Sequence, residues 1–358
     1  MQDKILILGS NGILGKYIIE KVIHSFGVEN LVISDYEKNR LSRKKEQICG
    51  QFGKEPNSRV IDVNSEDSVR KGLNSIGIVI LAIQQNEPLI QRLCLEYNIP
   101  SIDVSVNPKF ISKALSLNKQ TTNQSLQLIT AGLFPGLSGI LAKEIAKRSA
   151  KQETVDVGLL QSANGTNGKT GVSDMLTIFD RDVEWIQQDN SAIKSGFSHK
   201  KKFRFPDPIG NATLRLADFV ERNYLKSIGI NSNYWTSFDK ESLNKSISLL
   251  KKLGFLRLFK YPVVGNFLSA AISKQNQGDK QEVIGLVAKS SNSEIYMVLK
   301  SDYEATASCV IAFAKKMLGN KRSYNGVRFP FEAFIFEEIK SDVSDVIMEI
   351  SALDKVRG

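Results

Sequence analysis

Three glycines with a fixed spacing stand near the start of the chain, at Gly9, Gly12 and Gly15. They follow a short apolar run at residues 4–8 and precede apolar residues at helical spacing over residues 13–23. In such a strand, turn and helix, the first glycine permits a tight turn, the second lets a pyrophosphate approach the backbone, and the third lets the helix pack closely. Free main-chain amides and the positive helix end would then face the phosphates. The pattern favours a dinucleotide site.

Asp35 provides a second, independent signal. It follows the next apolar run and lies 20 residues beyond Gly15, where an acid would accept hydrogen bonds from the adenosine ribose hydroxyls. An ordinary loop-initiating aspartate is the alternative. Lys38, Arg40 and Arg43 follow closely and could bind a 2′-phosphate instead. NAD and NADP therefore both remain open, and we prefer NAD slightly because the carboxylate would repel a 2′-phosphate.

Strand and helix signals continue to alternate up to about residue 140, with strand candidates at residues 58–63, 77–83, 101–104 and 126–130. This alternation predicts an α/β protein with a Rossmann doubly wound parallel sheet, followed by a second α+β domain. Ligands of such sheets bind at the carboxyl ends of the strands. The residues that we expect to bind the coenzyme are Gly9, Ser10, Asn11, Gly12, Ile13, Leu14, Gly15, Asp35, Tyr36, Arg40, Asp62, Val63, Ala82 and Ile83.

No set of residues identifies a catalytic group. Asp103 and Ser105 are the best-placed candidates because they follow a strand, although structural turn chemistry would explain both. His199 lies beside three lysines, and we expect it to be exposed to solvent. The residues that we expect to line the substrate cleft are Ser105, Asn107, Phe134 and Pro135. In the turn at residues 131–138, Ser138 could cap the helix that follows.

The domain prediction is a dinucleotide-binding Rossmann domain at residues 1–140, a substrate and dimerisation domain at 141–302, and a C-terminal segment at 303–358 that returns to the first domain. From residue 154 the alternation breaks, and strands are expected at residues 154–162, 282–288 and 294–299. Residues 249–272 are the most apolar part of this region and carry basic flanks. They could form a subunit interface, a core or a membrane-surface segment. We expect a homodimer and no membrane contact.

The composition of the chain limits the kinds of binding partner that we expect. The chain has 358 residues, with 48 Lys and Arg against 38 Asp and Glu, so the formal charge of +10 could attract anions. The surplus is spread along the chain, so we expect a small-molecule substrate rather than a nucleic acid. Three cysteines without CxxC spacing and two histidines predict no metal site and suit a reducing cytoplasm. No uncharged apolar run reaches the roughly 18 residues of a membrane-spanning helix.

Several motifs together resemble the saccharopine dehydrogenase-like oxidoreductases. They are Gly9-x-x-Gly12-x-x-Gly15, Asp62-Val63, Ile102-Asp103-Val104-Ser105 and Ala-Gly-Leu-Phe-Pro-Gly-Leu-Ser at residues 131–138. The resemblance is specific over residues 1 to about 140, weak from 150 to 300, and moderate again at Gly-Val-Arg-Phe-Pro, residues 326–330, which look like the family's chain return to the first domain.

The resemblance implies hydride transfer between a nicotinamide coenzyme and an imine carbon. In the family's pattern an aspartate precedes the proline–glycine pair and a histidine follows it, whereas this chain has Phe134 and Gly139 there. The resemblance therefore applies to the coenzyme site of this chain, but it does not extend to the family's substrate site. The sequence predicts an NAD(P)-dependent oxidoreductase that acts at a C–N or C–O centre of a small substrate. The alternative is a dinucleotide-binding or redox-sensing protein without turnover.

Overall fold

The computed structural model describes residues 4–119, 125–149, 153–163, 169–187, 190–256, 282–319 and 324–354. The chain forms two compact units. The first holds Met1–Gly136 and Thr306–Val343, and the second holds Leu137–Ala305 and Ser344–Gly358.

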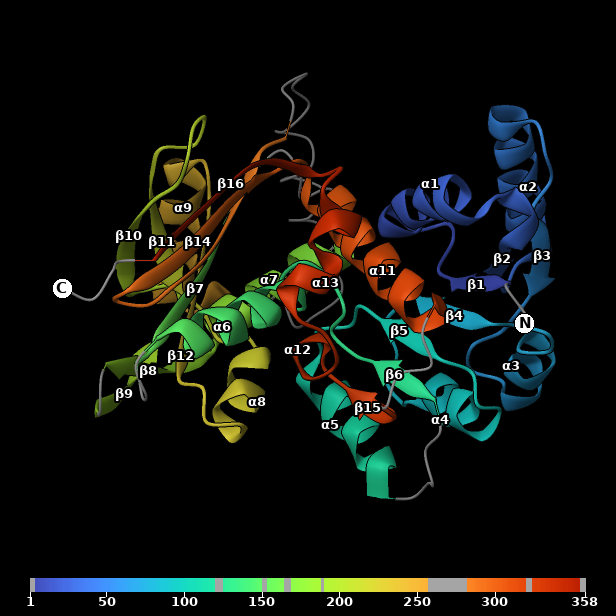
Figure 1. Ribbon diagram of the computed structural model, residues 1–358, viewed down its shortest axis with the longest axis horizontal. Coiled ribbons are helices and arrows are strands. Elements are labelled where there is room, and N and C mark those ends of the chain that lie inside the picture. Colours follow the sequence, from blue (N-terminus) through green and yellow to red (C-terminus); the bar gives the residue numbers. More distant parts are fainter. Residues whose placement is uncertain are drawn as a thin grey trace. The chain divides into compact units, whose positions relative to one another are not determined.

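The first unit is built on a parallel sheet of seven strands, in the order β15-β6-β5-β4-β1-β2-β3 (Figure 1). The strands are β1 (Ile5–Leu8), β2 (Leu31–Asp35), β3 (Asn57–Val60), β4 (Ile78–Leu81), β5 (Ser101–Asp103), β6 (Leu126–Leu128) and β15 (Gly326–Arg328). The helices are α1 (Ile13–Phe26), α2 (Lys38–Phe52), α3 (Glu66–Gly72), α4 (Leu89–Glu96), α5 (Pro108–Ser116), α12 (Pro330–Ala333) and α13 (Phe336–Ile339), with short 3-10 turns at Val28–Asn30, Leu117–Lys119 and Lys340–Val343.

Helices lie on both faces of this sheet, with α1 and α2 above it and α3 and α4 below it in Figure 1. All residues of β1 and β4 are therefore buried, which explains why both strands read as unbroken apolar runs. On the lower face, Leu6, Leu8, Val79 and Leu81 pack with Val69, Leu73, Ile90, Leu93 and Cys94 in one core cluster. This core fixes the strand ends from which the candidate site is built.

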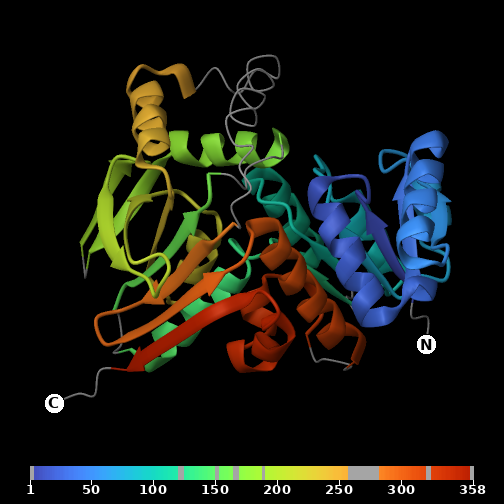
Figure 2. The same ribbon diagram turned by 90° about the horizontal axis from the view of Figure 1, so that it is seen from above.

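The second unit contains a mixed sheet of seven strands, in the order β10-β11-β12-β7-β13-β14-β16, and the separate hairpin β8–β9 (Figure 2). The strands are β7 (Val155–Gln161), β8 (Asp182–Gln187), β9 (Asn190–Ser195), β10 (Lys200–Arg204), β11 (Asn211–Leu216), β12 (Ser232–Phe238), β13 (Ile284–Lys289), β14 (Ser293–Leu299) and β16 (Ile347–Asp354). The helices are α6 (Leu137–Arg148), α7 (Lys169–Asp180), α8 (Glu221–Ser227) and α9 (Glu241–Lys252), while α11 (Asp302–Gly319) begins in this unit and continues into the first.

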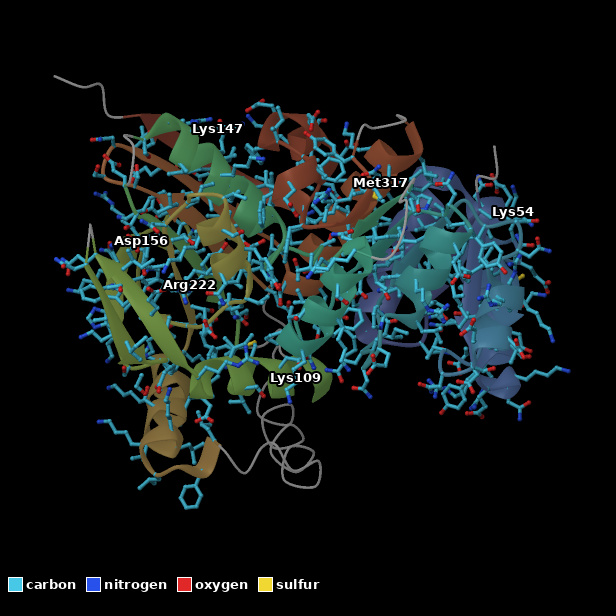
Figure 3. The ribbon with its side chains drawn as sticks, turned by 90° about the horizontal axis from the view of Figure 1, so that it is seen from below. Lys54, Lys109, Lys147, Asp156, Arg222 and Met317 are labelled. Carbon is cyan, nitrogen blue, oxygen red and sulfur yellow. The ribbon has the colours of Figure 1, made fainter. Side chains whose placement is uncertain are left out.

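Two charged groups inside the second unit have partners of opposite charge. Asp156, labelled in Figure 3, accepts a hydrogen bond of 2.7 Å from the indole nitrogen of the buried Trp235 and forms an ion pair with Lys201. Arg222, also labelled there, is 4% exposed and pairs with Glu184 at 3.2 Å. A buried charge is tolerated only when such a partner accompanies it. These pairs therefore have a structural role within the unit.

The predicted fold class is confirmed: a parallel Rossmann-like sheet precedes a second unit that mixes helices with an antiparallel-rich sheet. Residues 326–328 join the first sheet as β15, beside β6. The prediction that all of residues 303–358 return to the first domain is wrong at its end. β16 pairs with β14 of the second sheet, and this long-range pairing leaves no local signal in the sequence.

Two smaller expectations also need correction or restriction. Ser138 does not cap a helix, because α6 already begins at Leu137 and the Ser138 hydroxyl instead donates to the buried Glu221 carboxylate at 2.6 Å.

Within the segment 249–272, α9 ends at Lys252, and residues 257–281 lie outside the described part of the chain. The expected role of that segment as an interface, core or membrane contact therefore stays a prediction. No helix among the described residues is long and apolar enough to span a bilayer.

Candidate functional site

The turn between β1 and α1 is closed so tightly that side chains are excluded from two of its glycines. Gly9 has φ +95°, and a Cβ there would lie 2.5 Å from the carbonyl oxygen of Ala82. A Cβ on Gly15 would collide with the carbonyl oxygen of Gly9. Gly12 differs, because its Cβ would meet only that same Gly9 oxygen, at 3.3 Å. The outer side of the turn at Gly12 is therefore open, as a cradle for a pyrophosphate requires.

The amino end of α1 points its dipole into this cradle. Gly12 is the N-cap residue and supplies no side-chain cap, and the first amides of any helix lack an acceptor within the helix. The amides of Ile13, Leu14 and Gly15 are therefore suited to an anion, which the helix dipole also stabilises. Ser10 stabilises the sheet instead, because its buried hydroxyl donates to the Ser34 carbonyl at 2.6 Å and ties β1 to β2.

The structure brings Asn11, Asp35, Tyr36 and Arg40 together at the end of β2. The Asn11 amide donates to Asp35 Oδ2 at 2.6 Å, and the Arg40 guanidinium lies 3.4 Å from the same oxygen. Arg40 also lies 5.6 Å from the centre of the Tyr36 ring, which is 67% exposed. The carboxylate thus stands beside the glycine turn with a cation next to it. A carboxylate and a cation in these positions could distinguish a ribose hydroxyl from a 2′-phosphate.

Asp62 and Val63 follow β3, the neighbour of β2. The amide of Ile61 donates to the Asp35 carbonyl at 3.0 Å, so this segment runs alongside Asp35. The Asp62 carboxylate accepts from the Asn64 amide at 2.9 Å and so shapes the turn that leads into α3.

The ends of β4 and β5 form the next part of the site. The amide of Ala82 donates to the Leu8 carbonyl at 2.9 Å, which places Ala82 and Ile83 beside the glycine turn. Asp103, at the end of β5, is fully buried and accepts from the side-chain amides of Gln85 at 2.7 Å and Gln91 at 2.6 Å. This network links the loop after β4 to β5.

Asp103 is an unusual carboxyl group. Burial raises its pKa to about 6, and the hydrogen bonds that it accepts from Ser105, Gln91 and Gln85 counteract part of this rise. The Ser105 amide donates to Asp103 Oδ1 at 2.7 Å, so both carboxylate oxygens have donors. The Ser105 hydroxyl donates to the Ile83 carbonyl at 3.3 Å. Both catalytic candidates therefore hold the loop after β4 in place.

Sequence reasoning missed the role of Gln91. Its side-chain amide is completely buried on α4, among Ile90, Leu93 and Cys94. A glutamine on the apolar face of a predicted helix is a usable signal for a buried polar partner. The identity of that partner depends on the neighbouring strand and could not be read locally.

The turn after β6 contains Phe134 and Pro135. The amide of Ala131 donates to the Asp103 carbonyl at 2.8 Å, which anchors the start of the turn beside the Asp103 network. Thr130 adopts a left-handed conformation with φ 54° although its side chain is β-branched, a strained arrangement that occurs preferentially at functional sites. Phe134 is half-buried and Pro135 is buried.

Asn107 takes a structural part in the same unit. Its side-chain oxygen accepts from the Lys109 amide at 3.0 Å and caps the start of α5. The structure therefore gives this predicted cleft residue a helix-capping role, which leaves its place in a substrate cleft as a prediction.

His199 belongs to the second unit, and the expectation that it is exposed is wrong. The ring is half-buried, with its centre 4.7 Å from that of Trp185 and 6.0 Å from that of Trp235. Burial lowers its pKa, and the charges of Lys194 and Lys201 act in the same direction. The neighbouring lysines misled the prediction, because the ring is covered by Trp185 and Trp235 from other strands, which the local sequence does not show.

The second unit also has a cleft of about 800 Å³, lined in part by Lys201, Phe238 and Glu241. Two of its charged groups have partners within the unit: Lys201 pairs with Asp156, and Glu241 pairs with the buried Arg215 at 2.6 Å. Among the described residues, no group of three or more His, Cys, Asp or Glu side chains is placed to hold a metal ion.

Comparisons with known proteins agree with this geometry. Residues 5–129 match the family described as saccharopine dehydrogenase NADP binding domain. Among solved structures, the apo form of saccharopine dehydrogenase (L-Glu forming) from Saccharomyces cerevisiae is similar over 98% of this chain and 99% of that chain, with a TM-score of 0.64 and 11% identity. A probable dehydrogenase from Thermotoga maritima is similar over 95% and 93% of the two chains, with a TM-score of 0.44 and 11% identity.

No curated protein matches the sequence. The yeast likeness shows a shared fold over both units, and the family match covers the glycine turn, Asp35 and Asp103. The predicted resemblance is therefore confirmed over residues 5–129, which match the saccharopine dehydrogenase NADP binding domain family.

Proposed function

We propose that this chain is an NAD(P)-dependent oxidoreductase that catalyses hydride transfer at a C–N or C–O centre of a small substrate. The observation that carries the proposal is the glycine turn, which excludes side chains at Gly9 and Gly15 but leaves the outer side of Gly12 open. When bound, the nicotinamide coenzyme supplies the hydride chemistry. The chain itself binds the pyrophosphate through the amides at the start of α1 and holds the strand ends that surround the nicotinamide.

In this proposal Asp103 acts as a positioning residue. Because its two carboxylate oxygens accept hydrogen bonds from Gln85, Gln91 and the Ser105 amide, the group fixes the loop after β4 and does not shuttle protons. Phe134 and Pro135 supply an apolar wall on the substrate side. An apolar residue at position 134 disfavours an amino-dicarboxylate substrate of the kind that the family pattern implies.

A second candidate function is coenzyme binding without turnover. Two observations favour it: both oxygens of Asp103 are engaged by amides, and Phe134 replaces the acid of the family pattern. A panel of imines, amino acids and keto acids, each assayed with NADH or NADPH for loss of the reduced coenzyme, separates the two functions. Turnover of any member supports the oxidoreductase. Coenzyme binding with no turnover across the panel supports the binding protein.

For the coenzyme we propose NAD. The family description names NADP, but in this chain Asp35 stands beside the turn with its side chain 7% exposed and already paired with Arg40. A 2′-phosphate would meet the Asp35 carboxylate and would have to compete for Arg40, whereas ribose hydroxyls could donate to Asp35 directly.

Replacing Gly12 by alanine should abolish coenzyme binding and leave the fold intact. The added methyl group would lie 3.3 Å from the Gly9 oxygen, a close contact that needs only a small shift, but it would occupy the space that the pyrophosphate needs. We expect an affinity loss of at least about 100-fold by calorimetry, roughly 2.7 kcal/mol. Gly50→Ala on α2, where a Cβ meets no atom within 4 Å, is the matched control. Unchanged affinity in Gly12→Ala would contradict the cradle.

Replacing Asp35 by serine should shift the preference toward NADP. The change removes the carboxylate that repels a 2′-phosphate and frees Arg40 to bind it. We expect the ratio of NADP to NAD affinity to rise about tenfold or more, since one charge-assisted contact is worth roughly 1.5–3 kcal/mol. Titration of wild type and variant with both coenzymes measures this. A wild type that binds NADP more tightly would overturn the NAD proposal.

Asp103 should make stability depend on pH. Its folded-state pKa of about 6 exceeds its ordinary value of 3.8, so its contribution to stability is fully present below pH 3.8 and is lost as the pH rises through 6. We expect this loss to be about 1–3 kcal/mol of unfolding free energy. Denaturant titrations of wild type and Asp103→Asn at several pH values measure it. A difference between the two that does not change over this window would rule the effect out.

A further inference from the structure

One strand of the second sheet has a neighbour on both sides over only part of its length. β11 pairs with β10 over residues 211–215, but it pairs with β12 only at Arg215 and Leu216. β12 itself continues in the sheet as far as Phe238, where it still pairs with β7. The β10–β11 hairpin therefore separates from the rest of the sheet between Arg215 and Asn211, and an opening lies between β11 and β12.

On the β12 side of this opening, a side chain takes the place of the missing strand. The Asn244 side-chain oxygen accepts from the Phe238 amide at 2.9 Å, and the Asn244 side-chain nitrogen donates to the Phe238 carbonyl at 2.8 Å. Asn244 is 1% exposed, so this contact is shielded from water. The main chain of β12 is thus satisfied at its end without β11.

On the β11 side, main-chain groups point into the opening. The Leu216 amide donates to the His199 carbonyl at 2.9 Å, so the even-numbered residues of β11 direct their main chain toward β10. Because these directions alternate along an antiparallel pair, the amides and carbonyls of Asn211 and Thr213 point the other way. Within the described part of the chain, no strand lies opposite them. They are available to a ligand.

The cleft of about 800 Å³ in the second unit lies in this opening. Residues 211–213 of β11 line one wall, and apolar side chains from the rest of the unit, including Leu160, Ile209 and Phe238, line another. Leu160 and Phe238 are each 7% exposed. A cleft of this volume, with an apolar lining and a few polar groups, is typical of small-molecule sites.

The acidic side chains of the cleft already have donors within the protein. Glu241 pairs with the buried Arg215 at 2.6 Å, and the Asp239 carboxylate accepts from the Ala163 amide at 2.8 Å. Neither acid is therefore placed to recruit a cation from solution.

Two basic side chains of the cleft are differently placed. Lys200 and Lys202 alternate along β10, which puts them on the same face of the strand, and both are exposed. Lys200 lies 4.0 Å from Glu241, whereas Lys202 forms no ion pair with any residue that the structure describes. Thr213 lies opposite Lys202 in the register of the hairpin. A cation, a hydroxyl and a main-chain amide thus occur together at Lys202 and Thr213.

We propose that this cleft binds an organic acid with an apolar body. The carboxylate lies beside Lys202 and Thr213, where the ammonium group and the main-chain amide donate to it. The apolar body lies against Leu160 and Phe238, away from water. The site lies wholly in the second unit. Its occupation requires neither coenzyme nor turnover, so its test is independent of the proposed oxidoreductase activity.

Octanoate is a suitable probe because it joins a carboxylate to an unbranched apolar chain. We expect calorimetry on the full chain, without coenzyme, to show saturable binding at one site per chain. 1-Octanol lacks the charge and acetate lacks the apolar body, so each should bind about tenfold more weakly or worse. Absence of saturable octanoate binding overturns the proposal, and so does equal binding of octanoate and 1-octanol.

Removal of one charge tests the carboxylate position. Lys202→Gln should weaken octanoate binding about tenfold or more and leave the binding of 1-octanol unchanged. Lys245→Gln is the matched control, because Lys245 is an exposed lysine on α9 of the same unit that does not line the cleft. This variant should bind octanoate as the wild type does. Equal affinities in the two variants would contradict the assignment of Lys202.

Protection of a thiol locates the bound ligand. Ala212→Cys places a small reactive group in the wall of the cleft, and saturating octanoate should slow its alkylation about tenfold. Ile193→Cys on β9, where the side chain is 70% exposed and does not line the cleft, should react at the same rate with and without octanoate. The unsubstituted chain gives the background from its own cysteines. Binding that leaves the thiol at residue 212 unprotected lies elsewhere and rules this site out.

Discussion

The first unit depends on the close approach of α1 to β1. The first turn of α1 passes so close to the carbonyl oxygen of Gly9 that a side chain at that point would collide with it. Gly15 has no side chain and therefore allows this approach. Ala82, which follows the neighbouring strand β4, closes the turn from the other side. Because three main-chain segments meet there, the amides of the helix start are held in fixed positions before any ligand arrives. Such preorganisation reduces the ordering cost of binding an anion.

This constraint extends along the sheet through hydrogen bonds rather than through apolar packing alone. The Leu8 carbonyl accepts from the Ala82 amide, the Asp103 carboxylate accepts from Gln85, and the Asp103 main-chain carbonyl accepts from the Ala131 amide. Burying a carboxylate at this point is unfavourable, as its raised pKa indicates, yet it fixes the loop after β4, while the main-chain carbonyl of Asp103 holds the start of the turn after β6. A buried polar network of this kind favours one arrangement of the loops over looser alternatives. Backbone and side-chain amides therefore have different roles. Backbone amides are suited to bind the coenzyme, and side-chain amides hold the surrounding loop in place.

Much of the first unit could be predicted from the sequence because its signals are local. The glycine spacing, the unbroken apolar run of β4 and the acid after β2 each occupy one short stretch, and the structure has strands and a helix there. The features that were missed depend on distant partners. Gln91 meets Asp103 through tertiary packing, and His199 is covered by two tryptophans from other strands. Helix α2 was missed for another reason, since it is mostly polar and has two buried residues, Leu41 and Ile48.

The structural role of residues 347–354 depends on pairing with a strand that is distant in the sequence. Taken alone, residues 347–354 form a short strand pattern that could belong to either unit. Paired with β14, the segment becomes the last strand of a sheet whose first strand is β10. The place of the segment in the second unit therefore depends on main-chain pairing with residues 293–299, which are distant in the sequence, and no local pattern indicates that pairing.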